Sequence, residues 1–121
     1  MKANELMIGD WVRCTDPKPF RIEQIDGVEE QVYGDDGFFV DTADLQPIPM
    51  TEEILEKNGF DMDDYTVHFK EDEHYMLELV FEDDELKWTI NCNEYTIMNF
   101  EYVHELQHAL RLCGIEKEII L

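Results

Sequence analysis

The sequence predicts an α+β fold: an N-terminal SH3-like small β-barrel, a linking helix, and then an antiparallel sheet with one C-terminal helix. Short alternating segments separated by Gly and Asp turns fill the first part of the chain. Longer alternating segments and a final helical period fill the rest. We therefore assign 1–48 to the SH3-like β unit, 49–60 to a linker with a short helix, and 61–121 to the sheet and C-terminal helix. A chain of 121 residues can also bury these parts in one shared core.

The strands expected in the N-terminal unit are short and lie close together in the sequence. They are residues 11–14, 20–25, 31–33 and 38–40. Asp26 and Gly27 signal a turn after the second strand, and the Gly-Asp-Asp-Gly segment 34–37 separates the last two. Four or five short strands joined by tight turns are typical of an SH3-like barrel.

Three aromatic residues of this unit, Trp11, Phe20 and Tyr33, are candidates for a binding groove. A small β unit also needs large apolar side chains inside. The favoured interpretation therefore places at least one or two of the three in the core.

The linker combines a proline boundary with a well-signalled helix. Pro47 and Pro49 restrict the backbone to extended geometry. Thr51 is the predicted N-cap, with two glutamates in the first turn, and Asn58-Gly59 is a stop signal. Met50 and Leu55 are spaced for a hydrophobic staple across the cap.

The C-terminal part has the alternation of a meander followed by a helix. Expected strands are residues 65–69, 75–81, 86–92 and 95–98, and a short terminal strand is expected over 115–121. A helix capped near Asn99 and running to Cys113 would bury Leu106 and Leu110 against the sheet. The expected partners in that core are Leu77, Leu79, Trp88 and Ile90.

The formal net charge of −21 constrains the possible partners. Nine basic residues against thirty acidic ones argue against direct binding to nucleic acid, because such binding needs Lys and Arg at the phosphates. The acidic side chains are spread along the whole chain. They either only solubilise the protein or present an acidic surface to a basic partner, as a DNA-mimicking decoy would.

Other sequence features predict a cytoplasmic protein without a bound cofactor. No apolar run approaches the length that spans a bilayer, and the N-terminus has no apolar signal segment. The three cysteines, Cys14, Cys92 and Cys113, are odd in number and far apart, which is typical of neither a disulfide framework nor a zinc knuckle. Neither a membrane nor a nucleic acid is an expected partner.

Residues 104–108 spell His-Glu-Leu-Gln-His, the zinc-peptidase motif. In that interpretation His104 and His108 bind zinc and Glu105 is the general base. A catalytic zinc takes three protein ligands, and the usual third-ligand spacing finds Arg111 and Gly114 in place of Gly and His. An acidic residue such as Glu116 would have to complete the site.

Helical geometry favours a chance match. Residues 102, 103, 106, 109, 110 and 113 form one apolar face of the C-terminal helix, and His104 and His108 lie on the opposite face with Gln107 and Arg111. The favoured interpretation is a solvated helix face with no catalytic and no metal-binding residue. A small zinc hydrolase that uses residues 104–108 stays the alternative.

Three segments of the chain resemble a family of short uncharacterised proteins from gut Bacteroidetes genomes and their mobile elements. They are 5–12 (ELMIGDWV), 45–60 around Leu-Gln-Pro-Ile-Pro-Met-Thr, and 102–107 (YVHELQ). The resemblance implies no activity. In that family the last segment resembles Tyr-Val-His-x-Leu-Gln-Asn, without the glutamate and the second histidine.

The sequence thus predicts a non-enzymatic accessory or interaction protein of phage or mobile-element origin. Its partner is unknown and, if one exists, is a basic protein. The small zinc hydrolase and the acidic DNA-mimic decoy are the two alternatives.

Overall fold

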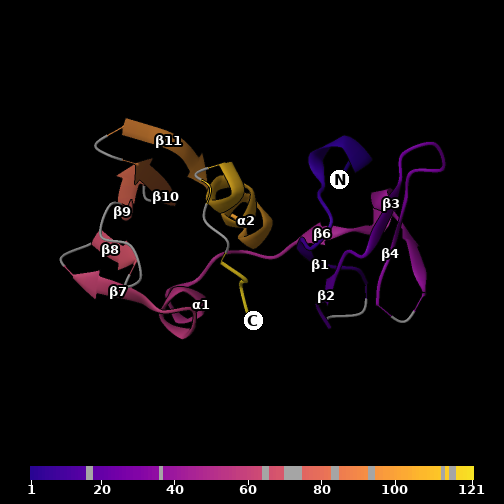
Figure 1. Ribbon diagram of the computed structural model, residues 1–121, viewed down its shortest axis with the longest axis horizontal. Helices are drawn as coiled ribbons and strands as arrows, with labels where there is room; N and C mark the ends of the chain where they lie inside the picture. Colours follow the sequence, from indigo (N-terminus) through magenta and orange to yellow (C-terminus); the bar gives the residue numbers. More distant parts are fainter. Residues whose placement is uncertain are drawn as a thin grey trace. The chain divides into compact units, whose positions relative to one another are not determined.

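The structure is a computed structural model that describes residues 1–15, 18–35, 37–63, 66–69, 75–82, 85–92, 95–112, 114 and 117–121. It is a mixed α+β fold of small antiparallel sheets with one main helix. The chain divides into two compact units (Figure 1). The first unit is residues 1–49 with 102–104, and the second is 50–101 with 105–121.

The first unit is built from two three-stranded antiparallel sheets, with strands of two or three residues. One sheet has the order β2-β1-β6 and the other the order β3-β4-β5. The strands are β1 (Trp11–Arg13), β2 (Phe20–Arg21), β3 (Gln24–Asp26), β4 (Gln31–Tyr33), β5 (Phe39–Asp41) and β6 (Gln46–Pro47). Two short 3-10 helices, η1 (Ala3–Glu5) and η2 (Thr42–Asp44), complete the unit.

The predicted SH3-like barrel is not confirmed, since the described strands form two sheets that do not close into a barrel. The expected strand over 20–25 is interrupted at Ile22 and Glu23. The Ile22 N–H donates to the Asp10 carbonyl at 3.0 Å, whereas the Glu23 N–H donates to the Tyr33 carbonyl at 2.8 Å. Ile22 is thus bonded beside β1 of one sheet and Glu23 to β4 of the other, so this segment connects the two sheets.

The core of the first unit gathers apolar side chains from both sheets and from residues that directly follow η1, β2 and η2. Its buried members are Leu6, Val12, Phe20, Ile22, Val32 and Leu45. Glu30, a non-glycine residue with a φ of 53°, connects two neighbouring segments through its side chain. Its carboxylate accepts hydrogen bonds from the Ala3 N–H at 3.0 Å and the Thr42 hydroxyl at 3.1 Å.

The short helix is confirmed as the cap chemistry predicts. Helix α1 (Glu52–Lys57) begins after Thr51, whose hydroxyl accepts from the Ile54 N–H at 3.2 Å. It ends at Asn58, and Gly59 has a φ of 90°, a conformation that favours glycine. Met50 and Leu55, the predicted staple pair, are both buried.

The second unit is a five-stranded antiparallel meander in the order β11-β10-β9-β8-β7. Its strands are β7 (Phe60–Asp63), β8 (Thr66–Phe69), β9 (Tyr75–Glu82), β10 (Glu85–Cys92) and β11 (Tyr95–Phe100). Strand β7 is not among the strands expected from the sequence, although the alternation of Phe60 and Met62 with Asp61 and Asp63 is the pattern of a strand. It is an edge strand of the sheet.

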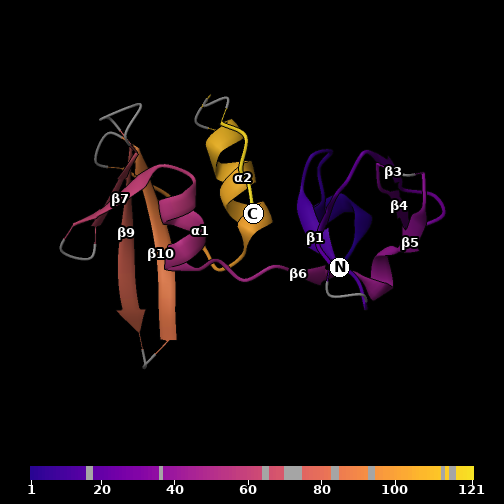
Figure 2. The ribbon, with the colours of Figure 1, turned by 90° about the horizontal axis from the view of Figure 1, so that it is seen from below.

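The C-terminal helix α2 (Val103–Leu112) starts later than the sequence predicts. The predicted cap residue Asn99 lies in β11, where its side-chain oxygen accepts from the Thr89 hydroxyl at 2.7 Å. Val103, Leu106, Ala109 and Leu110 are buried, as is Trp88 of the sheet, so the predicted apolar face is confirmed at these positions. The side chains of Leu77, Leu79 and Ile90 lie outside the described part of the structure. Figure 2 shows α1 and α2 on the same side of the sheet.

The expected terminal strand is wrong for 117–121, which form no strand. The backbone of this segment is hydrogen-bonded at Ile120 by the side chain of Asn58. The Asn58 amide donates to the Ile120 carbonyl and accepts from the Ile120 N–H, both at 2.7 Å. Ile119, which precedes Ile120 in the sequence, is buried. Its burial explains why the segment is apolar.

Candidate ligand-binding pocket

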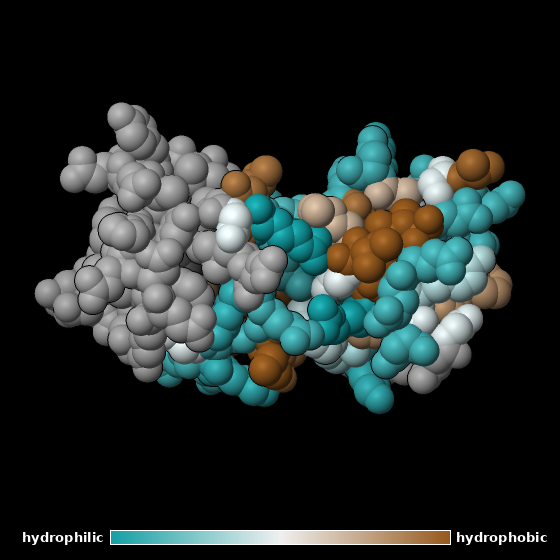
Figure 3. Space-filling view, in the orientation of Figure 1, coloured by the Kyte–Doolittle hydropathy of each residue, from teal (hydrophilic) through white to brown (hydrophobic). Residues whose placement is uncertain are grey.

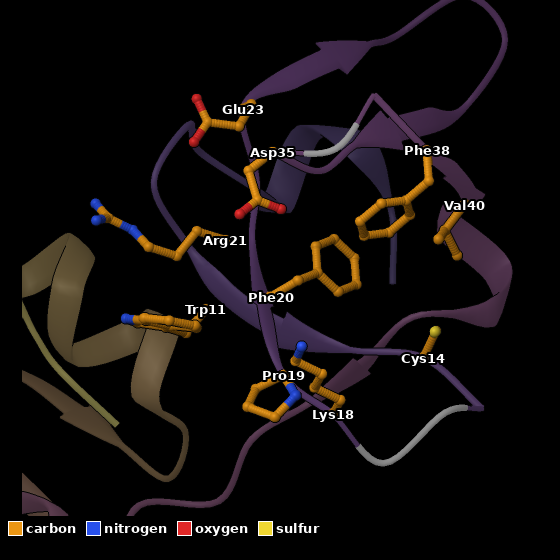
Figure 4. Close-up of a pocket in the computed structure, with 10 residues that line it drawn as sticks. All are labelled: Trp11, Cys14, Lys18, Pro19, Phe20, Arg21, Glu23, Asp35, Phe38 and Val40. Carbon is orange, nitrogen blue, oxygen red and sulfur yellow. The ribbon is translucent and has the colours of Figure 1, made fainter.

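A pocket of about 670 Å³ lies in the first unit, within the size range of small-molecule and peptide side-chain sites. Its lining comes from β1, β2, β5 and the loops between strands (Figure 4). The lining residues are Trp11, Cys14, Lys18, Pro19, Phe20, Arg21, Glu23, Asp35, Phe38 and Val40. Aromatic rings and four charged side chains therefore face one concavity.

The first wall follows from the register between β1 and β2. Trp11 pairs with Arg21 across the two strands, so both side chains lie on the same face. The guanidinium carbon of Arg21 stands 5.8 Å from the centre of the Trp11 ring, within cation–π distance. Arg21 Nε also donates to the Gly9 carbonyl at 3.4 Å. Contacts within the protein thus hold Arg21 and Trp11 together.

The second wall is formed by the loop between β4 and β5. The Gly34 N–H donates to the Phe38 carbonyl at 3.0 Å, and Gly37 has a φ of 75° that favours glycine. This tight loop brings the Phe38 ring onto Gly34, where an added Cβ would lie 2.4 Å from two ring carbons. The ring also meets Phe20 edge to face, with the centroids 5.0 Å apart and the planes at 72°. Gly34 is therefore needed for the position of Phe38.

The charged groups of the pocket differ in what they contact. Glu23 and Asp35 are exposed, and neither carboxylate has a hydrogen-bond or ion-pair partner among the described residues. Figure 4 draws these two carboxylates on one side of the pocket and Lys18 with Pro19 on the opposite side. Arg21, by contrast, is already in contact with Trp11 and Gly9. The carboxylates are thus the charges at this site that remain available to a ligand.

The aromatic groove considered from the sequence exists in a different form. Trp11 and Phe20 line the pocket, and Phe20 is also part of the core, as the favoured interpretation predicts. Tyr33 is not among the lining residues; it lies half-buried beside Phe39, with ring centroids 6.1 Å apart. Phe38 is the third ring of the pocket, and sequence reasoning assigned it only to a strand. The signal that points to it is Gly34, a position without a side chain four residues earlier.

On the face shown in Figure 3 the described surface is mostly hydrophilic, with an apolar patch over the first unit. Large apolar side chains of this unit that stay exposed are Met7, Ile8, Val28, Phe38 and Phe39. Of these, Phe38 also lines the pocket. Contiguous exposed apolar patches are typical of interaction surfaces.

The zinc-motif histidines do not both face solvent, which corrects one sequence interpretation. His104 is buried with 7% of its surface exposed, and its ring stacks on Tyr102 at 6.1 Å with an interplanar angle of 14°. Gln107 is buried as well, whereas His108 is half-buried and Arg111 is exposed. The polar face of α2 is therefore solvated only in part, because His104 in the first turn packs against Tyr102 and Gln107 is buried.

Glu105, the candidate general base, has a structural contact. Its carboxylate accepts a hydrogen bond from the Glu101 N–H at 3.1 Å, just before the start of α2. Such contacts satisfy backbone donors at a helix N-terminus. Glu116 lies outside the described residues. Within the described part of the chain, no three His, Cys, Asp or Glu residues gather into a group that could hold a metal ion.

The cysteines offer no paired site in the described structure. Cys14 is a free, half-buried cysteine that lines the pocket, and Cys92 ends strand β10. Cys113 lies outside the described residues. Among the residues searched, no helix is both long and apolar enough to cross a membrane.

Comparison of the chain with models of known protein families, with curated proteins and with solved structures found no match.

Proposed function

We propose that the protein is a non-enzymatic interaction protein whose first unit binds a peptide segment of a protein partner in the pocket. The observation that carries this proposal is the pocket wall of Trp11, Phe20 and Phe38, with uncompensated carboxylates at the rim. A few anchoring residues carry most of the binding energy at protein interfaces, and aromatic side chains are enriched in the cores of these interfaces, which have a polar rim.

The way in which the pocket walls are held in place supports a binding role more than a catalytic one. Its walls are fixed by backbone register and by the packing of Phe38 on Gly34, so the cavity needs little reorganisation to accept a ligand. Two sheets connected through Ile22 and Glu23, whose N–H groups donate to Asp10 and Tyr33, are also compatible with the SH3-like character expected from the sequence. A mobile-element or phage origin, implied by the family resemblance, stays part of the proposal.

A random dodecapeptide display library, selected against the whole protein, tests this proposal. We expect enriched peptides whose affinity falls about tenfold or more in Phe38→Ala, because truncating an anchoring ring removes one wall. Phe39→Ala is the matched control: Phe39 is the next residue, is 60% exposed and is not part of the lining. The proposal fails if no peptide is enriched, or if the enriched peptides bind Phe38→Ala as tightly as the unmodified protein.

A further inference from the structure

We infer that the pocket recognises an arginine side chain of the partner. This inference rests on the proposed function and names the chemical group that the same site takes. It starts from an asymmetry among the charges. Arg21 is in contact with the Trp11 ring and the Gly9 carbonyl, whereas the carboxylates of Glu23 and Asp35 have no partner among the described residues.

Arginine satisfies both kinds of surface that the pocket offers. Its planar guanidinium stacks on aromatic faces and donates through a fork that matches a carboxylate. Phe20 and Phe38 supply the rings, and Asp35 lies in the loop that also positions Phe38. One arginine entering the pocket would therefore meet an aromatic wall and an acceptor held by the same short loop.

The charge of the whole protein acts in the same direction. At a net charge of −21 the protein attracts cationic ligands and repels acidic ones over distances of several ångströms. Lys18 is the other basic residue of the lining, and it lies on the opposite side of the pocket from the two carboxylates (Figure 4). Lys18 is for this reason the most useful control position.

The probes are four acetylated and amidated glycine pentapeptides whose central residue is arginine, lysine, leucine or glutamate. Their binding to the full chain is followed by the NMR signal of the Trp11 indole N–H. We expect the arginine peptide to bind tightest and the glutamate peptide weakest. Raising the NaCl concentration from about 0.05 M to about 0.5 M should lower the affinity for the arginine peptide, because salt screens exposed ion pairs.

Charge-removing variants decide which side of the pocket makes the contact. Asp35→Asn and Glu23→Gln should each lower the affinity for the arginine peptide by about twofold to fivefold, which is the range for exposed ion pairs. Lys18→Gln should increase that affinity, because it removes a positive charge from the opposite side of the same pocket. The arginine assignment is overturned if Lys18→Gln weakens binding and Asp35→Asn does not, because the ligand group would then be an anion.

Failure of this inference can be told apart from failure of the proposed function. If the leucine or the glutamate peptide binds tightest and loses affinity in Phe38→Ala, the pocket binds peptides but the arginine assignment is wrong. If none of the four pentapeptides and no library peptide shifts the Trp11 signal, both the inference and the proposed function are wrong.

Discussion

The two units of this protein reach stability by different means. The second unit has strands of up to eight residues in sequential order, and its described core includes Trp88, Phe100, Leu106 and Leu110. The first unit has strands of two or three residues, held by contacts such as those of Glu30. Long hairpins specify their own register, whereas very short strands depend on their loops.

The candidate site lies in the unit with the shorter strands. In the first unit the loops must be fixed for the sheets to form, so their side chains are held in defined positions. Phe38 and Asp35 belong to one such loop and line the pocket. Binding residues often lie on loops that a scaffold positions. The following predictions test whether the two units differ in this way, beginning with the largest expected effect.

Leu106→Ala should have the largest effect, since Leu106 is fully buried in the second unit. We expect a loss of about 2–5 kcal/mol in the free energy of unfolding, from lost apolar burial and a cavity. Urea unfolding followed by fluorescence measures it. Leu112→Ala is the control on the same helix: Leu112 is 77% exposed, so its change should stay within about 0.5 kcal/mol. Equal effects of the two variants would show that the buried face of α2 is assigned wrongly.

Gly34→Ala tests the loop of the first unit. The new methyl group would collide with the Phe38 ring, so we expect a loss of about 1–3 kcal/mol and weaker binding of any pocket ligand. Calorimetric melting and peptide titration measure the two effects. Gly27→Ala is the matched control, because no atom lies within 4 Å of its added Cβ. A Gly34→Ala protein with unchanged stability and affinity would contradict the role given to Phe38.

The histidines of the zinc motif should differ from each other. His104→Ala should cost about 1 kcal/mol, since His104 is buried against Tyr102, and the half-buried His108→Ala should cost less. The incomplete ligand set predicts less than one tightly held zinc ion per chain after dialysis. Elemental analysis checks the zinc content. Stoichiometric zinc that disappears in either variant would establish the metal site instead.

Added salt should produce the smallest effect. Thirty acidic side chains on 121 residues repel one another, and counter-ions screen that repulsion. We expect the melting temperature to rise by a few degrees, on the order of 1 kcal/mol of stability, between low and moderate salt. Calorimetry in NaCl measures this change. The same measurement in a neutral osmolyte of matched osmolality separates the screening of charges from the effect of a solute that is excluded from the protein surface. A melting temperature independent of NaCl would show that the acidic groups are well separated or paired.

Features determined by local chemistry could be predicted from the sequence. Thr51 and Gly59 bound α1 as expected, because a hydroxyl cap and a glycine stop act within one turn. The buried apolar positions of α2 follow from its period, whereas the burial of His104 and Gln107 does not. The start of α2 could not be predicted, since no Ser, Thr, Asp or Asn directly precedes it and Glu105 instead accepts from the Glu101 N–H ahead of the helix.

The pocket depends on contacts between segments that are distant in sequence and was therefore predicted only in part. Trp11 and Phe20 are aromatic residues in recognisable strands, and both line it. The part played by Phe38 depends on the missing side chain of Gly34 and on the backbone hydrogen bond between Gly34 and Phe38. Composition and periodicity carry no information about such a contact.

The central claim, that the first unit is the binding part of the protein, is tested most directly by its two tryptophans. Trp11 lines the pocket of the first unit, and Trp88 is buried in the second with 2% of its surface exposed. Titration with the best peptide from the display library, followed through the two indole N–H signals, compares the units in one sample. The account predicts that the Trp11 signal shifts in a saturable way while the Trp88 signal stays in place. A saturable shift of Trp88 with Trp11 unchanged would contradict it.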